Sequence, residues 1–177
     1  MQEISEPRNQ PILFPNEFYK FPSTRYQGSK AKLVDWIWDN VSDLEFQTML
    51  DAFGGTGVVS YKAKMNEKSI TYNDFLKFNY YFGVGLIENK NVKLSSEDVN
   101  FLLSKHSDVS YQTFVQDTFQ DIYFTEEENK WVDQIIANIY NLPNRYKFAI
   151  AFFALSQACI IKRPYNLFHR KNLYMRL

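Results

Sequence analysis

The alternation of apolar and polar residues is clearest between residues 48 and 87. Thr48–Phe53 is a short apolar run that ends at glycines, which is typical of a buried parallel strand, and Ser69–Tyr72 predicts a second strand. The spacing of apolar residues predicts helices over Gly57–Lys64 and Leu76–Ile87, and the second of them is rich in aromatic side chains. This strand–helix–strand–helix order is typical of a doubly wound α/β sheet.

The segments on either side of this region have a different character. Residues 1–24 contain prolines and little periodicity, which indicates an extended lead-in, and helical spacing is found over Ser29–Trp38. Further along, the pattern is helical over Ser95–Ser104, Glu126–Tyr140 and Arg145–Ile161. Hydroxyl groups and acids stand at the starts of the first two of these helices, where they satisfy free amides and the helix dipole. The sequence therefore predicts three parts: the lead-in 1–24, an α/β part 25–92 and a mainly helical part 93–177.

Composition is that of a single globular domain, because 177 residues with 45% apolar side chains are enough to bury a core. Twenty basic and twenty acidic residues cancel, so the net charge by itself indicates no polyanionic partner. The distribution is uneven, since the segment Lys162–Leu177 holds five Lys or Arg residues and no acid. A basic end on an otherwise acidic chain predicts a local binding surface.

The cysteine and histidine residues indicate the cellular compartment and whether the chain holds a metal site. Cys159 is the single cysteine, so no intrachain disulfide can form, and a reducing compartment is indicated. His106 and His169 are isolated and, with Cys159, predict no metal site. No long apolar run and no signal-peptide pattern are present, so we expect a cytoplasmic protein without a membrane partner.

The turn after the first predicted strand carries the strongest chemical signal. Its spacing, Asp51-x-Phe53-x-Gly55-x-Gly57, differs from the dinucleotide fingerprint, and no Gly-Lys-Ser/Thr follows that would bind a triphosphate. Glycines let the backbone approach a ligand closely. The acid at the strand end favours a ligand with an ammonium or hydroxyl groups, such as S-adenosylmethionine, whose ammonium Asp51 would hold directly or through water. The alternative is a plain βα turn that needs glycines for tight packing.

A second acid, Asp74, follows the second predicted strand. It stands about twenty residues after the turn, where dinucleotide-binding folds place the carboxylate that binds ribose hydroxyls. The alternative interpretation is an N-cap for the helix that begins at Leu76. Capping and ribose binding are compatible, so this alternative does not exclude a site.

A short motif lies upstream, Arg25-Tyr26-Gln27-Gly28-Ser29-Lys30. Gly28 predicts a bend, Ser29 a helix cap, and Tyr26 and Lys30 are placed to face the same pocket. An ordinary cap beside a surface lysine is the alternative.

Taken in order, RYQGSKAKL, LDAFGGTG and YND resemble the Dam-type (α-group) DNA adenine-N6 methyltransferases. The forms LDAFGGTGVVSY and YNDFLKFNYYFG are most similar to methylases of type IIS restriction–modification systems. The resemblance spans residues 22–92 and 145–177. It implies a Rossmann-like α/β fold that binds S-adenosyl-L-methionine, with a helical part for DNA recognition. Matched position by position, it implies donor contacts at Tyr26, Lys30, Asp51, Phe53, Gly55, Gly57 and Asp74.

The basic end supports a DNA partner independently of this resemblance. Cationic, amide and aromatic side chains alternate there, and such groups bind phosphates, read adenine edges and stack on bases. A solvated basic chain end is the alternative. The predicted contacts to double-stranded DNA are Lys162, Arg163, Asn166, His169, Arg170 and Lys171.

One motif of the family is absent from the 177 residues. Its members accept the exocyclic amine of the flipped adenine on an Asp/Asn-Pro-Pro-Tyr/Phe segment, and neither Arg163-Pro164-Tyr165 nor Asn141-Leu142-Pro143-Asn144 fits that pattern. The family order places this motif beyond Leu177. We therefore expect no catalytic residue within the chain, which alone would be inactive. It would represent the N-terminal half of such an enzyme, as a truncated or broken chain or as one subunit of a split enzyme.

Two further hypotheses stay open. The chain is alternatively a non-catalytic DNA-binding or partner subunit that keeps the methyltransferase fold, which predicts salt-dependent DNA binding and no response to the donor. The third hypothesis is a methyltransferase for RNA or a small molecule, which the fold alone does not exclude.

Overall fold

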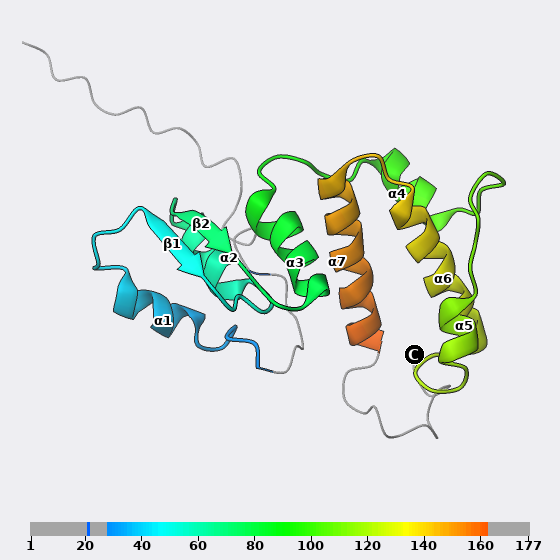
Figure 1. The fold of residues 1–177 in the computed structure, drawn as a ribbon, viewed down its shortest axis with the longest axis horizontal. Coiled ribbons are helices and arrows are strands. Elements are labelled where there is room, and N and C mark those ends of the chain that lie inside the picture. Colours follow the sequence, from blue (N-terminus) through cyan, green and yellow to red (C-terminus); the bar gives the residue numbers. More distant parts are fainter. Residues whose placement is uncertain (1–20, 22–27, 163–177) are drawn as a thin grey trace, which may run out of the picture.

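The computed structural model describes residue 21 and residues 28–162, and every structural statement below refers to these residues. They form an α/β part followed by a helical part, with helix α7 between them (Figure 1). The elements in chain order are α1 Val34–Val41, β1 Thr48–Asp51, α2 Val58–Met65, β2 Ser69–Tyr72, α3 Lys77–Gly83, the π-helix η2 Val84–Glu88, α4 Ser96–Leu103, α5 Phe114–Thr118, α6 Glu126–Tyr140 and α7 Arg145–Lys162.

The two strands form a parallel pair joined by the crossover helix α2, as the sequence predicts. Thr48 pairs with Ser69 at one end, and Asp51 pairs with Tyr72 at the other, so both strands finish at the same edge. An α/β architecture with a small parallel sheet is thus confirmed. The prediction of a buried strand is wrong: no residue of β1 or β2 is buried, and Leu50 is 66% exposed. The reason is that the described elements leave one face of this two-stranded sheet uncovered.

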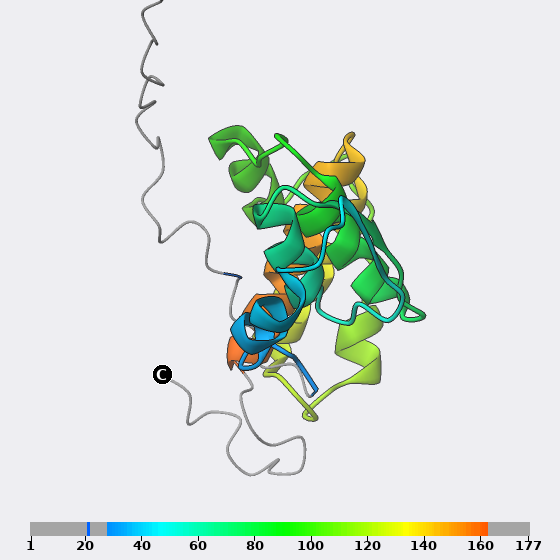
Figure 2. The same cartoon turned by 90° about the vertical axis from the view of Figure 1, so that its left-hand side faces the viewer.

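Helix α1 begins at Val34, five residues later than the apolar spacing predicts. The hydroxyl of Ser29 accepts a hydrogen bond from the Ala31 amide at 3.3 Å, which stabilises a turn in place of a helical cap. The helix buries none of its residues and lies against α2 (Figure 2). The ion pair Lys62–Asp35 (2.8 Å) joins the two helices.

The segment predicted as one helix over Leu76–Ile87 divides into α3 and the π-helix η2. Both pack against α7. Gly85 explains the close approach, because a Cβ there would lie 3.2 Å from the carbonyl carbon of Ala149 in α7. At this point η2 and α7 approach closely because Gly85 has no side chain.

The helical part follows the predicted pattern closely. Helix α6 has the predicted bounds, and α4 lies within its predicted range. Ser95 and Thr125 are N-caps in complete capping boxes, which confirms the prediction that the hydroxyls and acids satisfy the helix starts. Helix α5 was not predicted. The buried carboxylate of Asp133 accepts hydrogen bonds from its first amides, those of Val115 and Gln116 (2.9 and 3.0 Å).

A core of apolar side chains holds α4, α6 and α7 together. Its fully enclosed members are Leu102, Ile135, Ile139, Ala151 and Leu155, and the rings of Phe148 and Phe152 pack against them. Burial of this kind is the dominant favourable contribution to folding. The stability of the helical part therefore rests mainly on packing.

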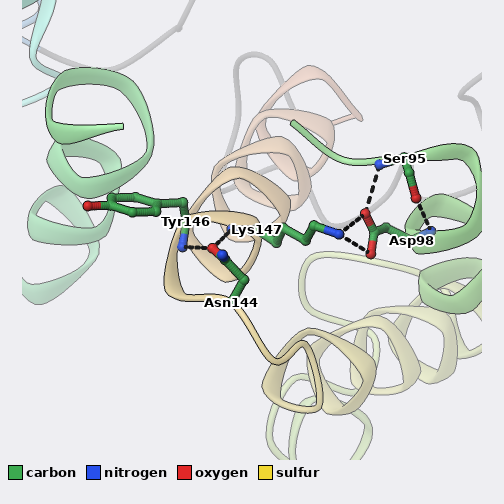
Figure 3. A network of polar contacts seen from close by, with 5 residues as sticks. All are labelled: Ser95, Asp98, Asn144, Tyr146 and Lys147. Atoms are coloured by element: carbon green, nitrogen blue, oxygen red, sulfur yellow. Dashed lines mark hydrogen bonds and ion pairs between the residues drawn. The ribbon is translucent and has the colours of Figure 1, made fainter. Parts of the chain in front are cut away.

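A polar network joins the starts of α4 and α7 (Figure 3). The ammonium of Lys147 lies 2.9 and 2.6 Å from the two carboxylate oxygens of Asp98, which also accepts a hydrogen bond from the Ser95 amide at 2.7 Å. At the start of α7, the Asn144 side-chain oxygen accepts hydrogen bonds from the amides of Tyr146 and Lys147. The capping acid of one helix is therefore also the ion-pair partner of the next.

Candidate functional site

The two strands end at one edge, where the glycine turn 52–57 leads into α2. Gly55 and Gly57 have φ angles of 56° and 81°, in the left-handed region that disfavours residues with a Cβ. Gly57 is also the N-cap of α2. The glycines of the predicted motif are thus required by backbone conformation, as a close-approach turn needs.

The segment that follows β2 is bonded to this turn at several points. The Asp74 carboxylate accepts a hydrogen bond from the Gly55 amide at 2.8 Å, and the Gly54 amide donates to the Asn73 carbonyl at 2.9 Å. The Asn73 side chain donates in turn to the carbonyl of Ala52 at 2.8 Å. Residues nineteen to twenty-one positions apart are therefore held together at the strand ends, as the sequence predicts for Asp74 and the glycine turn.

Most of the hydrogen-bond acceptor positions of the Asp74 carboxylate are occupied. Besides the Gly55 amide, it accepts hydrogen bonds from the Leu76 amide at 2.8 Å and the Asn79 side chain at 3.0 Å. Partial burial tends to raise the pKa of Asp74, but these three hydrogen bonds outweigh that effect and hold the pKa below its usual range. A carboxylate has about four lone-pair sites, which leaves room for one more donor. Asp74 is not the N-cap of the helix that follows: Leu76 is the N-cap residue of α3, and no described side chain makes a capping hydrogen bond there.

Asp51, the last residue of β1, is half-buried beside the turn. One of its oxygens accepts a hydrogen bond from the hydroxyl of Ser60 in α2 at 2.6 Å, and Ser60 is fully buried. No other hydrogen bond to the Asp51 carboxylate is found within the described residues, although the Asp51 backbone carbonyl accepts one from the Asn73 amide at 2.9 Å. The second oxygen is therefore available to an external donor, and Ser60 fixes the orientation of the carboxylate, a role that sequence reasoning missed.

Two phenylalanines project from the strand ends into solvent. Phe53, a predicted site residue, is 87% exposed, and Phe75, directly after Asp74, is 95% exposed. Contiguous exposed apolar surface can mark a binding site, whereas single exposed side chains are common, so the two rings count only through their position beside the acids. Phe75 was missed, although its position next to the second acid, on the matching edge of the sheet, was the available signal.

The upstream motif is not joined to the turn within the described residues. Lys30 is exposed, and its ammonium donates to the neighbouring Gly28 carbonyl at 3.4 Å. It makes no hydrogen bond to the described part of the glycine turn. Tyr26 lies outside the described residues, so the predicted donor contacts of this motif stay predictions.

A mainly apolar cavity of about 340 Å³ borders the turn. Thr56 of the turn lines it, together with the rings of Phe78 and Phe82 from α3 and side chains of α6 and α7. Gln157 of α7 also lines it, and the buried amide nitrogen and oxygen of this side chain have no hydrogen-bond partner in the part of the chain that the structure describes. The helical part thus reaches the same edge of the sheet as the acids.

The predicted DNA contacts fall at the end of the described chain. Lys162 is the last residue of α7, and the other five predicted residues lie outside the described residues: Arg163, Asn166, His169, Arg170 and Lys171. Within the described ranges, no group of three or more His, Cys, Asp or Glu side chains is placed to hold a metal ion. None of the described helices combines the length and apolarity needed to cross a membrane.

Comparison with known proteins shows which family the chain belongs to. The sequence model of the D12 class N6 adenine-specific DNA methyltransferases matches residues 26–160. The chain belongs to this family. In this D12-class chain the matched segment contains both strands, the glycine turn, both acids and most of α7. The predicted resemblance is confirmed at the level of the family, whereas the Dam-type and type IIS assignments stay predictions.

Three relatives are type II methyltransferases. M2.HphI of Haemophilus parahaemolyticus is 34% identical over 149 residues, which cover 84% of this chain and 43% of the relative. M.NlaIII of Neisseria lactamica is 28% identical, with coverage of 67% and 38%, and M.CviAII of Paramecium bursaria Chlorella virus 1 is 29% identical, with coverage of 71% and 42%. The chain thus spans about two fifths of the length of the curated relatives it matches. No solved structure matches the chain.

Proposed function

We propose that the chain is the donor-binding and partly DNA-recognising portion of a Dam-type (α-group) DNA adenine-N6 methyltransferase of a restriction–modification system. The observation that carries this proposal is the hydrogen bond between the two strand ends, which the Asp74 carboxylate accepts from the Gly55 amide of the glycine turn. Two acids, a turn with positive φ angles and exposed rings then share one edge. Family membership and the type II methyltransferase relatives support it.

The residues at this edge fit S-adenosyl-L-methionine by their chemistry. Asp51 has one carboxylate oxygen without a hydrogen bond to a described residue, which would accept from an ammonium, and Asp74 has room for one hydroxyl of a ribose. Gly55 and Gly57 admit a ligand close to the backbone, and Phe53 offers an aromatic surface to a planar ring. When bound, this donor supplies an electrophilic methyl group. The chain's own residues bind and orient, so their contribution to rate would come from proximity and alignment.

Calorimetric titration with S-adenosylmethionine tests the donor site. Asp51→Ala and Asp74→Ala should each abolish measurable binding, because each removes a carboxylate that holds a charged or hydroxyl group of the ligand. The matched control is Asp43→Ala, which removes an exposed carboxylate away from the edge. Binding by both site variants as tight as that of the wild type would refute these assignments.

We further propose that the basic end contacts double-stranded DNA through Lys162, Arg163, Asn166, His169, Arg170 and Lys171. Replacing its three adjacent cations (His169→Ala, Arg170→Ala, Lys171→Ala) should weaken duplex binding and flatten its dependence on salt, because fewer counterions are released. Fluorescence anisotropy at several salt concentrations measures both. Equal affinity and equal salt slope in the triple variant would exclude this surface.

Methyl transfer would require a further segment, since the 177 residues lack an Asp/Asn-Pro-Pro-Tyr/Phe motif. We propose that such a segment, on the same or a second polypeptide, completes the acceptor site. Addition of a polypeptide with this motif from the downstream reading frame should convert a donor-binding chain into an active enzyme in a methyl-transfer assay on DNA. Full activity of the 177 residues alone would contradict the proposal.

The alternative function is a non-catalytic DNA-binding or partner subunit that keeps the fold. It differs in one measurement, since such a protein binds duplex DNA and gives no calorimetric response to the donor.

A further inference from the structure

Tyr72, the last residue of β2, lies behind the glycine turn and is not among the residues to which a role has been assigned. Its hydroxyl donates a hydrogen bond to the Gly55 carbonyl at 2.6 Å and lies 3.1 Å from the Asn79 carbonyl. The hydroxyl thus lies between the turn and helix α3, at the level of the two acids.

The ring of Tyr72 occupies space that two glycines leave open. A Cβ on Gly54 would lie 2.1 Å from Cε2 of the ring, and a Cβ on Gly83 would lie 2.4 Å from Cδ1. These atoms belong to opposite edges of the ring. Gly54 is in the turn and Gly83 is the last residue of α3, so the ring fits between them only because both lack a side chain.

Hydrogen bonds hold Gly55 at both its amide and its carbonyl. Its amide donates to Asp74 at 2.8 Å, and its carbonyl accepts from Tyr72 at 2.6 Å. Its φ of 56° lies in the left-handed region, which flexible chains populate alongside other conformations. Two opposed hydrogen bonds select one conformation of a residue that is otherwise free to change.

We propose that Tyr72 is a positioning residue for donor binding, which holds the glycine turn in its binding conformation through the Gly55 carbonyl. This inference rests on the proposed function, because it assumes that the turn binds S-adenosylmethionine. Without the hydroxyl, a smaller fraction of molecules has the competent turn. The apparent affinity falls by that fraction, with no change in the groups that touch the donor.

The decisive variant is Tyr72→Phe, which keeps the ring between the glycines and removes only the hydroxyl. Donor affinity by calorimetry should fall about 3- to 10-fold, as expected for one lost hydrogen bond. The matched control is Tyr140→Phe, since Tyr140 is 72% exposed in α6 and its hydroxyl makes no hydrogen bond to a described residue. That variant should bind the donor like the wild type.

Hydrogen exchange without donor separates this positioning role from a general loss of stability. In Tyr72→Phe, amides of residues 52–58 should exchange faster, while those of α6 keep the wild-type rate. Uniformly faster exchange would indicate a merely structural role and overturn the inference, as would unchanged exchange in the turn. Gly54→Ala is a second test of the same contact, since its Cβ would lie 2.1 Å from the ring and displace it; faster exchange at 52–58 is again expected, and an unchanged rate would overturn the inference.

The outcomes also separate the inference from the proposed function. If the wild type binds the donor and Tyr72→Phe binds equally well, the positioning role is wrong and the proposed function stands. If the wild type does not bind the donor, the proposed function fails and, with it, the donor-binding role of Tyr72. Faster exchange at 52–58 would then establish only that Tyr72 holds the turn.

Discussion

Polar side chains form hydrogen bonds to backbone groups both at the glycine-turn edge and in the helical part, but the two regions differ in how deeply these side chains are buried. At the edge, Asp51, Tyr72 and Asp74 are half-buried, and the turn they border carries an 87% exposed phenylalanine. In the helical part, Asn138 and Asp133 are buried beneath an apolar core. Hydrogen bonds thus shape an open surface in one region and support a closed interior in the other.

This contrast predicts that the edge and the helical core contribute to different properties, the edge to donor binding and the core to stability. At the edge, hydrogen bonds order a surface that the proposed donor site would use, whereas in the helical part a core ordered by packing contributes stability. Substitutions in the helical core should therefore lower the free energy of unfolding and spare donor affinity. Substitutions at the edge should do the reverse.

The largest expected effect on stability comes from the core. Ile139→Ala removes a side chain that is 1% exposed, and the resulting cavity should lower the free energy of unfolding by about 2–5 kcal/mol. Urea denaturation followed by circular dichroism measures it. The control is Ile161→Ala, at a position 66% exposed, which should change stability by less than about 0.5 kcal/mol. Similar losses of stability in both variants would show that stability does not rest on the buried core.

A smaller loss is expected at Asn138, whose side chain supports the end of α4. Its amide nitrogen donates to the carbonyls of residues 101, 102 and 104, and its oxygen accepts from the Tyr111 hydroxyl. Asn138→Ala leaves these groups without a partner and should cost about 1–3 kcal/mol. In the control, Asn40→Ala, an exposed side chain loses one bond to a carbonyl in its own helix. Chemical denaturation should find a much smaller change there.

The ion pair at the junction of α4 and α7 should contribute less. Lys147 and Asp98 have side chains only 27% and 14% exposed, so Lys147→Met should lower the free energy of unfolding by about 1 kcal/mol. Lys130→Met is the matched control, because its pair with Glu126 is exposed on a single helix. We expect the first loss to persist in high salt and the second to be close to zero. The opposite order would show that the junction is not a stabilising contact.

Prediction from sequence succeeded where local pattern determines structure. The bounds of β2 and α6 and the caps Ser95 and Thr125 follow from apolar spacing and from hydroxyls at helix starts. The role of Asp74 beside the glycine turn was predicted from the position at which dinucleotide-binding folds place a carboxylate after the second strand, and Asp74 does bond to the turn.

Prediction failed where distant residues decide. Helix α5 depends on Asp133, seventeen to eighteen positions away, and Ser60 and Tyr72 are recognisable as site residues only from their bonds to Asp51 and Gly55. The close packing of η2 against α7 at Gly85 involves residues more than sixty positions apart. Such partners cannot be assigned from the spacing of residues in one segment.

The smallest expected effect is the acid sensitivity of the edge itself. The hydrogen bonds from Asn79, Leu76 and Gly55 outweigh partial burial and hold the pKa of Asp74 below its usual range. A lowered folded-state pKa stabilises the protein at pH values above the unfolded pKa of about 3.9, and this contribution is lost as the pH falls through the folded pKa. The difference in unfolding free energy between pH 7 and pH 3 should therefore be smaller in Asp74→Asn than in the wild type, by less than about 1 kcal/mol.

The control for this measurement is Asp43→Asn, which changes an exposed carboxylate without a described hydrogen bond. Asp98, Glu97 and Glu126 also have hydrogen-bonded carboxylates with lowered pKa values, so the wild-type decline includes their contributions, and only its difference from Asp74→Asn reports on the edge. An identical decline in both proteins would mean that Asp74 does not hold the turn through its charge. The edge would then owe its shape to the hydrogen bonds that Tyr72 and Asn73 make to the turn.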